Sequence, residues 1–393
     1  MKIWLLFCVL ATLTYAEGAN IALGGEHSCS VLTGGVVKCW GRNEYGQLGD
    51  GTTTDRTTPV DVSGITNATS LALSGWGHSC ALLIGDTIKC WGSNGNGKLG
   101  DGTFTSRTTP LDVYGITNAT SLALGSAHSC ALLSRGTVKC WGWGRQLGNG
   151  TITIDQTAPV DVYGITNATS LALGGSHSCA LLMSGTIKCW GFNSDGRLGD
   201  GTTTDRNTPV DVSGITNATS IALGGSHSCA MLTGGTIKCW GYNAYGQLGD
   251  GTYSGARTTP VDVSGITTAT SIALGMDNSC AVLTGGTMKC WGRNEYGQLG
   301  DGTTTDRTTP VDVMGLYGPL PSPLPPPSPL PPPSASTPLP STANTASPPP
   351  PLPPSPPPKL VTDDDDHAAG LTTILVALVA TTFNMLFSLS CVL

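Results

Sequence analysis

Six pairs of cysteines are the residues of this 393-residue chain whose type and spacing most clearly allow chemistry. The members of each pair stand ten positions apart, in near-copies of the segment HSCALLMSGTIKCW at residues 177–190. Two such thiols can oxidise to a disulfide, or they can bind a metal ion together with a nearby histidine. The pairs are Cys29 and Cys39, Cys80 and Cys90, Cys130 and Cys140, Cys179 and Cys189, Cys229 and Cys239, and Cys280 and Cys290.

The segment between two paired cysteines predicts a β-hairpin that places them opposite each other. Its midpoint in the first copy is Gly34, so a three-residue loop would consist of residues 33–35. The third loop position favours a left-handed residue, and it holds glycine in five copies and Asp86 in one. Opposed antiparallel positions lie about 4.5–5.5 Å apart at Cα, within reach of a disulfide. We therefore expect one disulfide in each repeat, worth roughly 3 kcal/mol by chain entropy.

A metal site is the alternative use of the same residues. His177 stands two positions before Cys179, and the hairpin register puts both side chains on one face. However, the sixth copy has Asn278 in the histidine position, and no Cys-x-x-Cys spacing occurs. The repeated Asp-Gly segment at residues 50–55 lacks the spacing of an EF-hand loop, and Asp-Gly is common in turns. We expect a structural histidine in the repeat, and neither a metal nor a cofactor.

The hairpins recur with a period of 49–51 residues, which indicates a repeat architecture. Each unit contains four short β-rich runs separated by turns rich in Gly, Asn and Asp, and none has helical periodicity. In the fifth unit the runs are residues 219–224, 228–232, 236–240 and 260–263. Four strands per unit are typical of propeller blades. The sequence therefore predicts an all-β fold, a β-propeller of six four-stranded blades over residues 17–318. A ring closed by seven blades is the alternative.

The repeated motifs resemble those of the regulator of chromosome condensation family. The first unit reads GGEHSCSVL…GVVKCWGRNEYGQLGDGT…TPVDV, and the motifs that carry the likeness are Gly-x-x-His-Ser, Gly-x-Val/Ile-x-x-Trp-Gly and Asn-x-x-Gly-Gln-Leu-Gly. The likeness covers residues 21–313 and recurs six times. It implies a β-propeller with blades of about 50 residues, and the best-known member of the family has seven blades.

The resemblance also implies several functions. The nuclear member of the family is a guanine-nucleotide exchange factor for a small GTPase, and an excursion from its propeller wedges against the GTPase. In this chain the period varies only between 49 and 51 residues, which leaves no room for such an excursion. The family also includes secreted propellers that bind proteins, and this chain resembles those more closely.

The six copies differ most in the loop that follows each Trp-Gly, at residues 42–47 in the first unit. Positions shared by all copies serve the fold, whereas positions that differ are free to serve binding. Several variable or inserted positions are aromatic, as in partner- or sugar-binding loops on rigid scaffolds, although drift among exposed loops gives the same pattern. The candidate binding residues are Tyr45, Trp76, Trp143, Phe192, Tyr242, Tyr245, Tyr253 and Tyr296.

The N-terminus has the features of a secretory signal. A basic Met1-Lys2 pair precedes an apolar stretch, and Thr14-Tyr15-Ala16 resembles a cleavage site, so we predict a signal peptide at residues 1–16. The oxidising compartment that it leads to suits disulfides. Asn-x-Ser/Thr sequons, four of them in the same place of the repeat, predict glycosylation. The sequons are Asn67, Asn118, Asn149, Asn167 and Asn217.

The segments after the repeats differ from them in composition. Residues 319–358 hold 21 of the 27 prolines and predict an extended polyproline II stalk. Residues 359–370 form an acidic spacer that ends in small residues, and residues 371–393 are apolar with no basic residue after them. This pattern fits a glycosylphosphatidylinositol signal better than a retained transmembrane anchor, which usually has basic residues on its cytoplasmic side.

Composition narrows the function. The net charge is −7 and no Lys/Arg cluster occurs, so we expect no nucleic-acid partner. We also expect no enzyme, because His and Asp recur once per blade instead of converging in one place. We predict a propeller on the extracellular face of the plasma membrane, held by its stalk and C-terminal anchor, that binds a surface protein or glycan. The alternatives are a structural cell-wall or coat glycoprotein and a regulator resembling the exchange factor.

Overall fold

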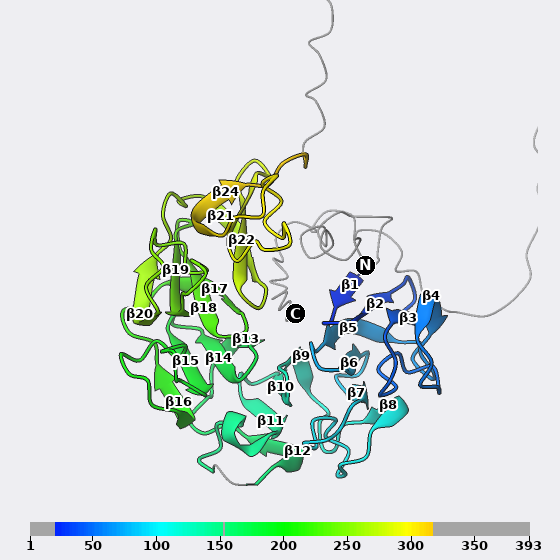
Figure 1. The fold of residues 1–393 in the computed structure, drawn as a ribbon. Helices are drawn as coiled ribbons and strands as arrows, with labels where there is room; N and C mark the ends of the chain where they lie inside the picture. The colour runs from blue at the N-terminus through cyan, green and yellow to red at the C-terminus, as the bar shows by residue number, and fades with distance from the viewer. Residues whose placement is uncertain (1–19, 152–153, 317–393) are drawn as a thin grey trace, which may run out of the picture. The chain divides into compact units, whose positions relative to one another are not determined.

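The computed structural model of the chain describes residues 20–151 and 154–316. The predicted signal peptide (1–16), stalk (319–358), spacer (359–370) and apolar tail (371–393) lie outside the described residues. The described part forms six antiparallel sheets of four strands, one short 3-10 helix, η1 (Gly144–Gln146), and no α-helix (Figure 1). It contains no helix that is long and apolar enough to cross a membrane. The prediction of six four-stranded β-blades is confirmed.

Within each blade the strands pair in chain order, and in the first five blades the first strand lies nearest the middle of the ring (Figure 1). The strands of the first three blades are β1 (Asn20–Leu23), β2 (His27–Val31), β3 (Val37–Gly41) and β4 (Arg56–Asp61); β5 (Ala68–Leu73), β6 (His78–Leu83), β7 (Ile88–Gly92) and β8 (Arg107–Asp112); and β9 (Ala119–Leu124), β10 (His128–Leu133), β11 (Val138–Gly142) and β12 (Gln156–Asp161).

The last three blades repeat this order. Their strands are β13 (Ala168–Leu173), β14 (His177–Leu182), β15 (Ile187–Gly191) and β16 (Arg206–Asp211); β17 (Ala218–Leu223), β18 (His227–Leu232), β19 (Ile237–Tyr242) and β20 (Ala256–Asp262); and β21 (Ala269–Leu274), β22 (Asn278–Leu283), β23 (Met288–Gly292) and β24 (Arg307–Asp312).

The tight hairpin between the second and third strands has the predicted register. In the first blade the Leu32 N–H donates to the Val36 carbonyl at 2.8 Å, which closes a three-residue loop. The third loop position has φ +81° at Gly35 and +62° at Asp86, which is the only non-glycine residue with positive φ among the described residues. Aspartate tolerates this conformation better than most residues. The loop chemistry therefore places the two cysteines of a repeat opposite each other, as the sequence predicted.

The outermost strand begins earlier than the sequence indicated. In the fifth blade we expected it at residues 260–263, whereas β20 runs from Ala256 to Asp262. Pro260 interrupts the sequence pattern because it lacks an N–H donor. The outermost strand has one free edge, however, and a proline there removes no ladder hydrogen bond.

The hydrophobic cores lie between neighbouring blades. One core joins Cys29, Val37 and Leu48 of the first blade to Ala81 and Trp91 of the second. Four further cores are built from similar residues at the equivalent places, and each includes the tryptophan of the following blade. Each blade is therefore stabilised mainly by contact with its neighbours, as in other repeat proteins.

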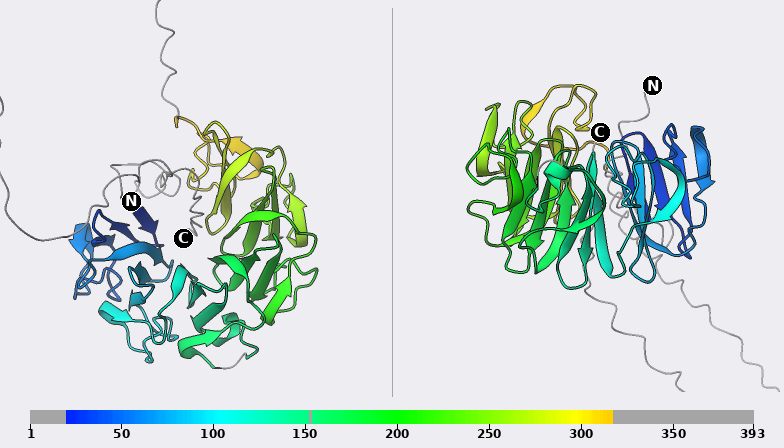
Figure 2. Two further views of the ribbon diagram at one scale, coloured as in Figure 1. Left: turned by 180° about the vertical axis from the view of Figure 1, so that it is seen from behind. Right: turned by 90° about the horizontal axis from the view of Figure 1, so that it is seen from below.

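Among the described residues, the six blades lie side by side around a ring that is open between the first and the last blade (Figures 1 and 2). Strand contacts join each blade to the next, from β1 and β5 at the start to β17 and β21 at the end. No comparable strand contact joins β21 back to β1 within the described residues. The ring therefore has five internal junctions and two end faces.

Candidate binding surface

In five of the six blades the loop after Trp-Gly is held by one buried asparagine. In the first blade the Asn43 side-chain oxygen accepts the Leu48 N–H at 2.9 Å, and its amide donates to the Thr52 and Thr54 carbonyls at 3.1 Å. The same contacts recur in most other blades. In the third blade Gly144 takes the asparagine position, and the shorter loop forms the 3-10 helix η1. These loops therefore present their variable side chains from a fixed backbone.

An aspartate–arginine pair ties the next loop to the outermost strand. In the last blade the Arg307 guanidinium contacts the Asp301 carboxylate at 2.6 Å, and the Asp301 side chain is only 5% exposed. Burial acts to raise the pKa of Asp301, but hydrogen bonds from Thr303 and Arg307 outweigh it and lower the pKa to about 2. These arginines are therefore structural anchors and are not free to bind a partner. The other pairs are Asp50–Arg56, Asp101–Arg107, Asp200–Arg206 and Asp250–Arg257.

Three of the predicted binding residues gather at the junction between the fifth and sixth blades. The Tyr242 and Tyr245 rings meet edge to face with centroids 6.2 Å apart. The Arg293 guanidinium of the sixth blade lies 5.0 Å from the centre of the Tyr245 ring. The Tyr253 hydroxyl, on the loop inserted in the fifth blade, donates to the Asp306 carbonyl at 3.2 Å. Side chains from two blades are thus joined into one surface, which we call the tyrosine pocket.

The tyrosine pocket is an open hollow of about 610 Å³. Tyr245 and Tyr253 supply apolar ring faces, while Glu295, Asp306 and two threonines supply polar groups at its wall. Arg293 is already paired with Glu295 and, at 3.4 Å, with Asp277. Arg293 therefore holds the Tyr245 ring and the carboxylates in place. Its positive charge is already paired with these carboxylates.

The electrostatics of the pocket follow from burial. Burial raises the pKa of Asp277, although Arg293 beside it acts in the opposite direction. Burial also raises the pKa of Tyr242, and the charges of Asp277 and Asp195 add to the effect. The Tyr242 hydroxyl therefore stays protonated near neutral pH and can donate hydrogen bonds.

The other candidate residues do not join this pocket. The Trp143 and Phe192 rings, from the third and fourth blades, lie 5.2 Å apart and form a second aromatic group. Trp76 is 65% exposed and Tyr296 is 61% exposed, and neither has a ring partner among the described residues. Tyr45 packs near Gly77, the residue after Trp76. The eight candidates are therefore spread around several junctions and do not form a single site.

Sequence reasoning missed the charged residues of the tyrosine pocket. Arg293 and Glu295 lie in the variable loop of the sixth unit, but the first unit has the same residue types at Arg42 and Glu44. Comparison between units therefore gave no reason to single them out. Only their position beside Tyr245 of the preceding blade sets them apart.

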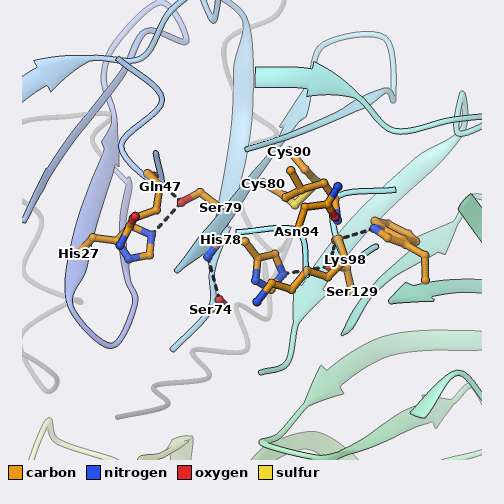
Figure 3. Close-up of a disulfide and its surroundings, with 12 residues drawn as sticks. His27, Gln47, Ser74, His78, Ser79, Cys80, Cys90, Asn94, Lys98 and Ser129 are labelled. Carbon is orange, nitrogen blue, oxygen red and sulfur yellow. Dashed lines mark hydrogen bonds between the residues drawn. A yellow bond between two sulfur atoms is a disulfide. The ribbon is translucent and has the colours of Figure 1, made fainter. Parts of the chain in front are cut away.

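The recurring histidine has a structural role at the blade junctions (Figure 3). His27 Nε2 lies 2.8 Å from the Ser79 hydroxyl of the next blade, and that hydroxyl donates to the Gln47 carbonyl at 2.9 Å. Burial lowers the pKa of His27 to about 3, so the ring is neutral at physiological pH. The structure joins Cys29 to Cys39 in a disulfide, with 4.1 Å between the Cα atoms, and the other five pairs alike. Over the described ranges, no three His, Cys, Asp or Glu side chains are grouped to hold a metal.

The five sequons lie in connecting segments outside the strands. Asn167 and Asn217 are exposed, whereas Asn67, Asn118 and Asn149 are half-buried. The Asn149 side-chain oxygen accepts the Thr151 N–H at 3.1 Å, which shapes a local turn. Glycosylation of these asparagines stays a prediction.

Known proteins share this architecture. The profile of the RCC1-like domain family matches residues 9–320. The ultraviolet-B receptor UVR8 of Arabidopsis thaliana is 35% identical over 95 residues, which are 24% of this chain and 22% of that protein. The match to this relative therefore spans only 22% of its length.

Solved structures give the same result for the fold. Yeast Prp20, crystallised with Kap60 bound, is 23% identical with a TM-score of 0.67, and the match covers 76% of this chain and 75% of that one. Human WBSCR16 is 22% identical with a TM-score of 0.68, and the match covers 76% and 82% of the two chains. Identity at this level shows a shared fold. Because the family profile matches most of the sequence and the structure has the six blades, this chain belongs to the RCC1-like domain family.

Proposed function

We propose that this chain is an interaction module that binds a protein partner through the tyrosine pocket. The observation that carries the proposal is the convergence of Tyr245 and Tyr253 of the fifth blade with Arg293 and Glu295 of the sixth. The wall of this hollow combines two aromatic rings with charged and polar groups, and such polar groups fix the orientation of a bound partner. Tyrosine and arginine are also the residues that most often contribute the largest share of binding energy at protein interfaces.

The charge of the pocket indicates the partner. Its wall carries Arg293 against the carboxylates of Glu295 and Asp306, and Arg293 is already paired. A partner loop with a basic side chain beside an apolar one therefore complements it best. The crystallised relative Prp20 has a protein, Kap60, bound to it, which supports a protein partner for this chain.

We propose further that the propeller is displayed outside the cell. The signal peptide, the Pro-rich stalk and the C-terminal apolar tail of the sequence support secretion, distance from the membrane and attachment, respectively. A rigid ring on an extended stalk can reach partners beyond the membrane surface. Exchange activity is not proposed, because likeness to the solved structures extends only to the fold.

The test measures binding of the fluorescently labelled protein to cells that carry the partner. The double variant Tyr245→Ala with Tyr253→Ala should weaken binding at least tenfold, because truncation of anchoring aromatics typically costs about 2 kcal/mol or more. The matched control is Tyr114→Ala with Tyr163→Ala, because these tyrosines are 73% and 71% exposed and lie away from the pocket. The control should bind as the natural protein does.

Two treatments of the cells separate the kinds of partner. Mild proteolysis of the cell surface should abolish binding if the partner is a protein. Loss of binding after glycosidase treatment, with proteolysis having no effect, would show a glycan partner instead. Equal binding by the pocket variant and the control variant would show that the tyrosine pocket is not the binding site.

A further inference from the structure

Each internal junction of the propeller is made from the same two half-interfaces. The leading blade supplies a histidine and the backbone carbonyl before its Leu-Gly, and the following blade supplies a serine and a tryptophan. At the first junction the indole of Trp91 and the hydroxyl of Ser79 both donate to the Gln47 carbonyl. The histidine–serine distances are 2.7–3.0 Å across the five junctions. The pairs are His27–Ser79, His78–Ser129, His128–Ser178, His177–Ser228 and His227–Ser279.

A glycine makes room for the tryptophan at each junction. A Cβ atom on Gly49 would lie 2.8 Å from Trp91 Nε1, so only glycine allows the indole to pack there. The same contact recurs at the other four junctions. The half-interface of the leading blade is therefore a socket shaped for an indole.

The first blade presents the tryptophan half-interface with no described blade before it. Ser28 and Trp40 occupy the places of Ser79 and Trp91, but both are half-buried, whereas their equivalents in the other blades are buried. The Trp40 indole and the Ser28 hydroxyl make no hydrogen bond to any described residue. Ile21, on the first strand of the same face, is 47% exposed. This face therefore has an indole N–H, a hydroxyl and apolar side chains available for a contact.

The last blade presents the socket half-interface with no described blade after it. Gln298 and Gly300 are half-buried, whereas their equivalents in the first five blades are buried. Val313 is also half-buried, and a Cβ atom on Gly300 would meet only this valine. The apolar cluster at this face is small and includes no tryptophan. Asn278 replaces the histidine and can still donate to, or accept from, a serine hydroxyl.

We infer that the opening of the ring accepts one further blade, supplied by a partner protein as a repeat of the same type. A repeat carries the tryptophan half-interface on one side and the socket half-interface on the other, so a single unit can satisfy both end faces at once. The first and last blades border the opening from opposite sides (Figure 1). In strand addition, a partner peptide pairs with the free edge of a sheet. Here the partner supplies a whole four-stranded blade.

A second copy of this chain fits the opening less well. Its internal blades use both of their sides in their own junctions, and each of its end blades has only one free side. It could therefore satisfy one face of the opening but not both. Direct contact between the first and last blades of one chain would require the five hydrogen-bonded junctions to shift together. A separate repeat needs no change in any of them.

The test uses an oxidised peptide with the sequence of residues 213–263, the fifth unit, as the probe. The full natural chain should bind this peptide with 1:1 stoichiometry in native mass spectrometry and calorimetry. A filled variant, in which a second copy of residues 213–263 follows Val263, should not bind it. Trp40→Ala and Val313→Lys, one on each end face, should each weaken binding at least tenfold. Tyr114→Ala, which touches neither face, should leave binding unchanged.

Four results would overturn the inference. Binding of the peptide to both the natural chain and the filled variant, or to neither, would show that the opening is not its site. A natural chain that is dimeric, with Trp40 resistant to oxidation by N-bromosuccinimide, would show that a second copy covers the faces. A monomeric natural chain in which Trp40 is as resistant as Trp240 would show that the two ends of one chain cover each other.

Discussion

The indole N–H of Trp91 donates a 2.8 Å hydrogen bond to the backbone carbonyl of Gln47 on the preceding blade. The equivalent bond measures 2.9–3.0 Å at the other four internal junctions. A buried N–H that loses its partner is costly, so this bond restricts how one blade can turn against the next. The variable loops carried by neighbouring blades are therefore held at a fixed spacing.

The two classes of tryptophan should differ in their contribution to stability. Trp240→Ala empties a fully buried site between two blades, and we expect it to lower the free energy of unfolding by about 3–5 kcal/mol. Trp40→Ala removes the half-buried indole at the end face and should cost less than about 1 kcal/mol in the absence of a partner. Denaturant titration followed by circular dichroism measures both. Equal losses would mean that Trp40 is as well packed in solution as Trp240.

The buried histidines should make stability depend on pH. Burial lowers the pKa of His27, His128 and His227 to about 3, from an ordinary value of 6.5. Below pH 6.5 the unfolded chain therefore binds protons that the folded chain does not. The free energy of unfolding should be greatest above pH 6.5 and fall as the pH drops toward 3, by at most about 1.4 kcal/mol per pH unit for each histidine.

A single substitution isolates this effect. His128→Asn introduces the residue that the sixth blade has at Asn278, and it removes one group that titrates in the unfolded chain. Stability measured between about pH 6.5 and 4.5, above the range in which most carboxylates titrate, should then have a shallower slope. Stability that does not change with pH over this window would show that the histidines become protonated in the folded protein.

The aspartate–arginine pairs should behave as coupled units. Asp200→Asn leaves Arg206 without its carboxylate, which lies 2.7 Å away, whereas the third blade has the neutral combination Asn149 and Gln156 at these positions. We expect Asp200→Asn to lower stability by roughly 1 kcal/mol more than the double variant Asp200→Asn with Arg206→Gln. A double-mutant cycle at neutral pH gives this difference. Additive losses would show that the pair is not coupled.

Each disulfide should contribute separately to stability. Reduction should add twelve hydrogen masses to the propeller in intact-mass analysis, because six bonds join its twelve cysteines. Replacement of both Cys229 and Cys239 by serine should cost roughly 3 kcal/mol, the chain-entropy value for a short loop. Peptide mapping should link only cysteines of the same hairpin, and a link between different repeats would contradict the register.

The proposed attachment of the protein to a membrane can be tested on intact cells. If residues 371–393 are a glycosylphosphatidylinositol signal, the mature chain should lack them, and phosphatidylinositol-specific phospholipase C should release the protein. Immunoblots of the supernatant and mass spectrometry of the C-terminal peptide measure the two effects. A protein that stays on the cells and retains the apolar peptide would be a transmembrane protein instead.

The local features of a blade could be derived from the sequence. The hairpin register followed from a loop of three residues with Gly35 or Asp86 at its left-handed position, because turn chemistry acts between neighbours in the chain. The number of blades followed from the period of the cysteine pairs. The start of β20 was harder to predict, since Pro260 is tolerated only because that strand lies at the edge of its sheet.

Only the tertiary structure decided which copy of a repeated residue contacts which partner in another blade. His27 pairs with Ser79, 52 residues away, but every repeat carries the same histidine–serine motif or its Asn278 variant, so the sequence offers many equivalent partners. The convergence of Tyr245 with Arg293 depends likewise on the packing of one blade against the next. The open faces at Trp40 and Gln298 are also a property of the ring. A repeated sequence specifies one kind of junction, whereas the curvature that the junctions produce together determines whether its two ends meet.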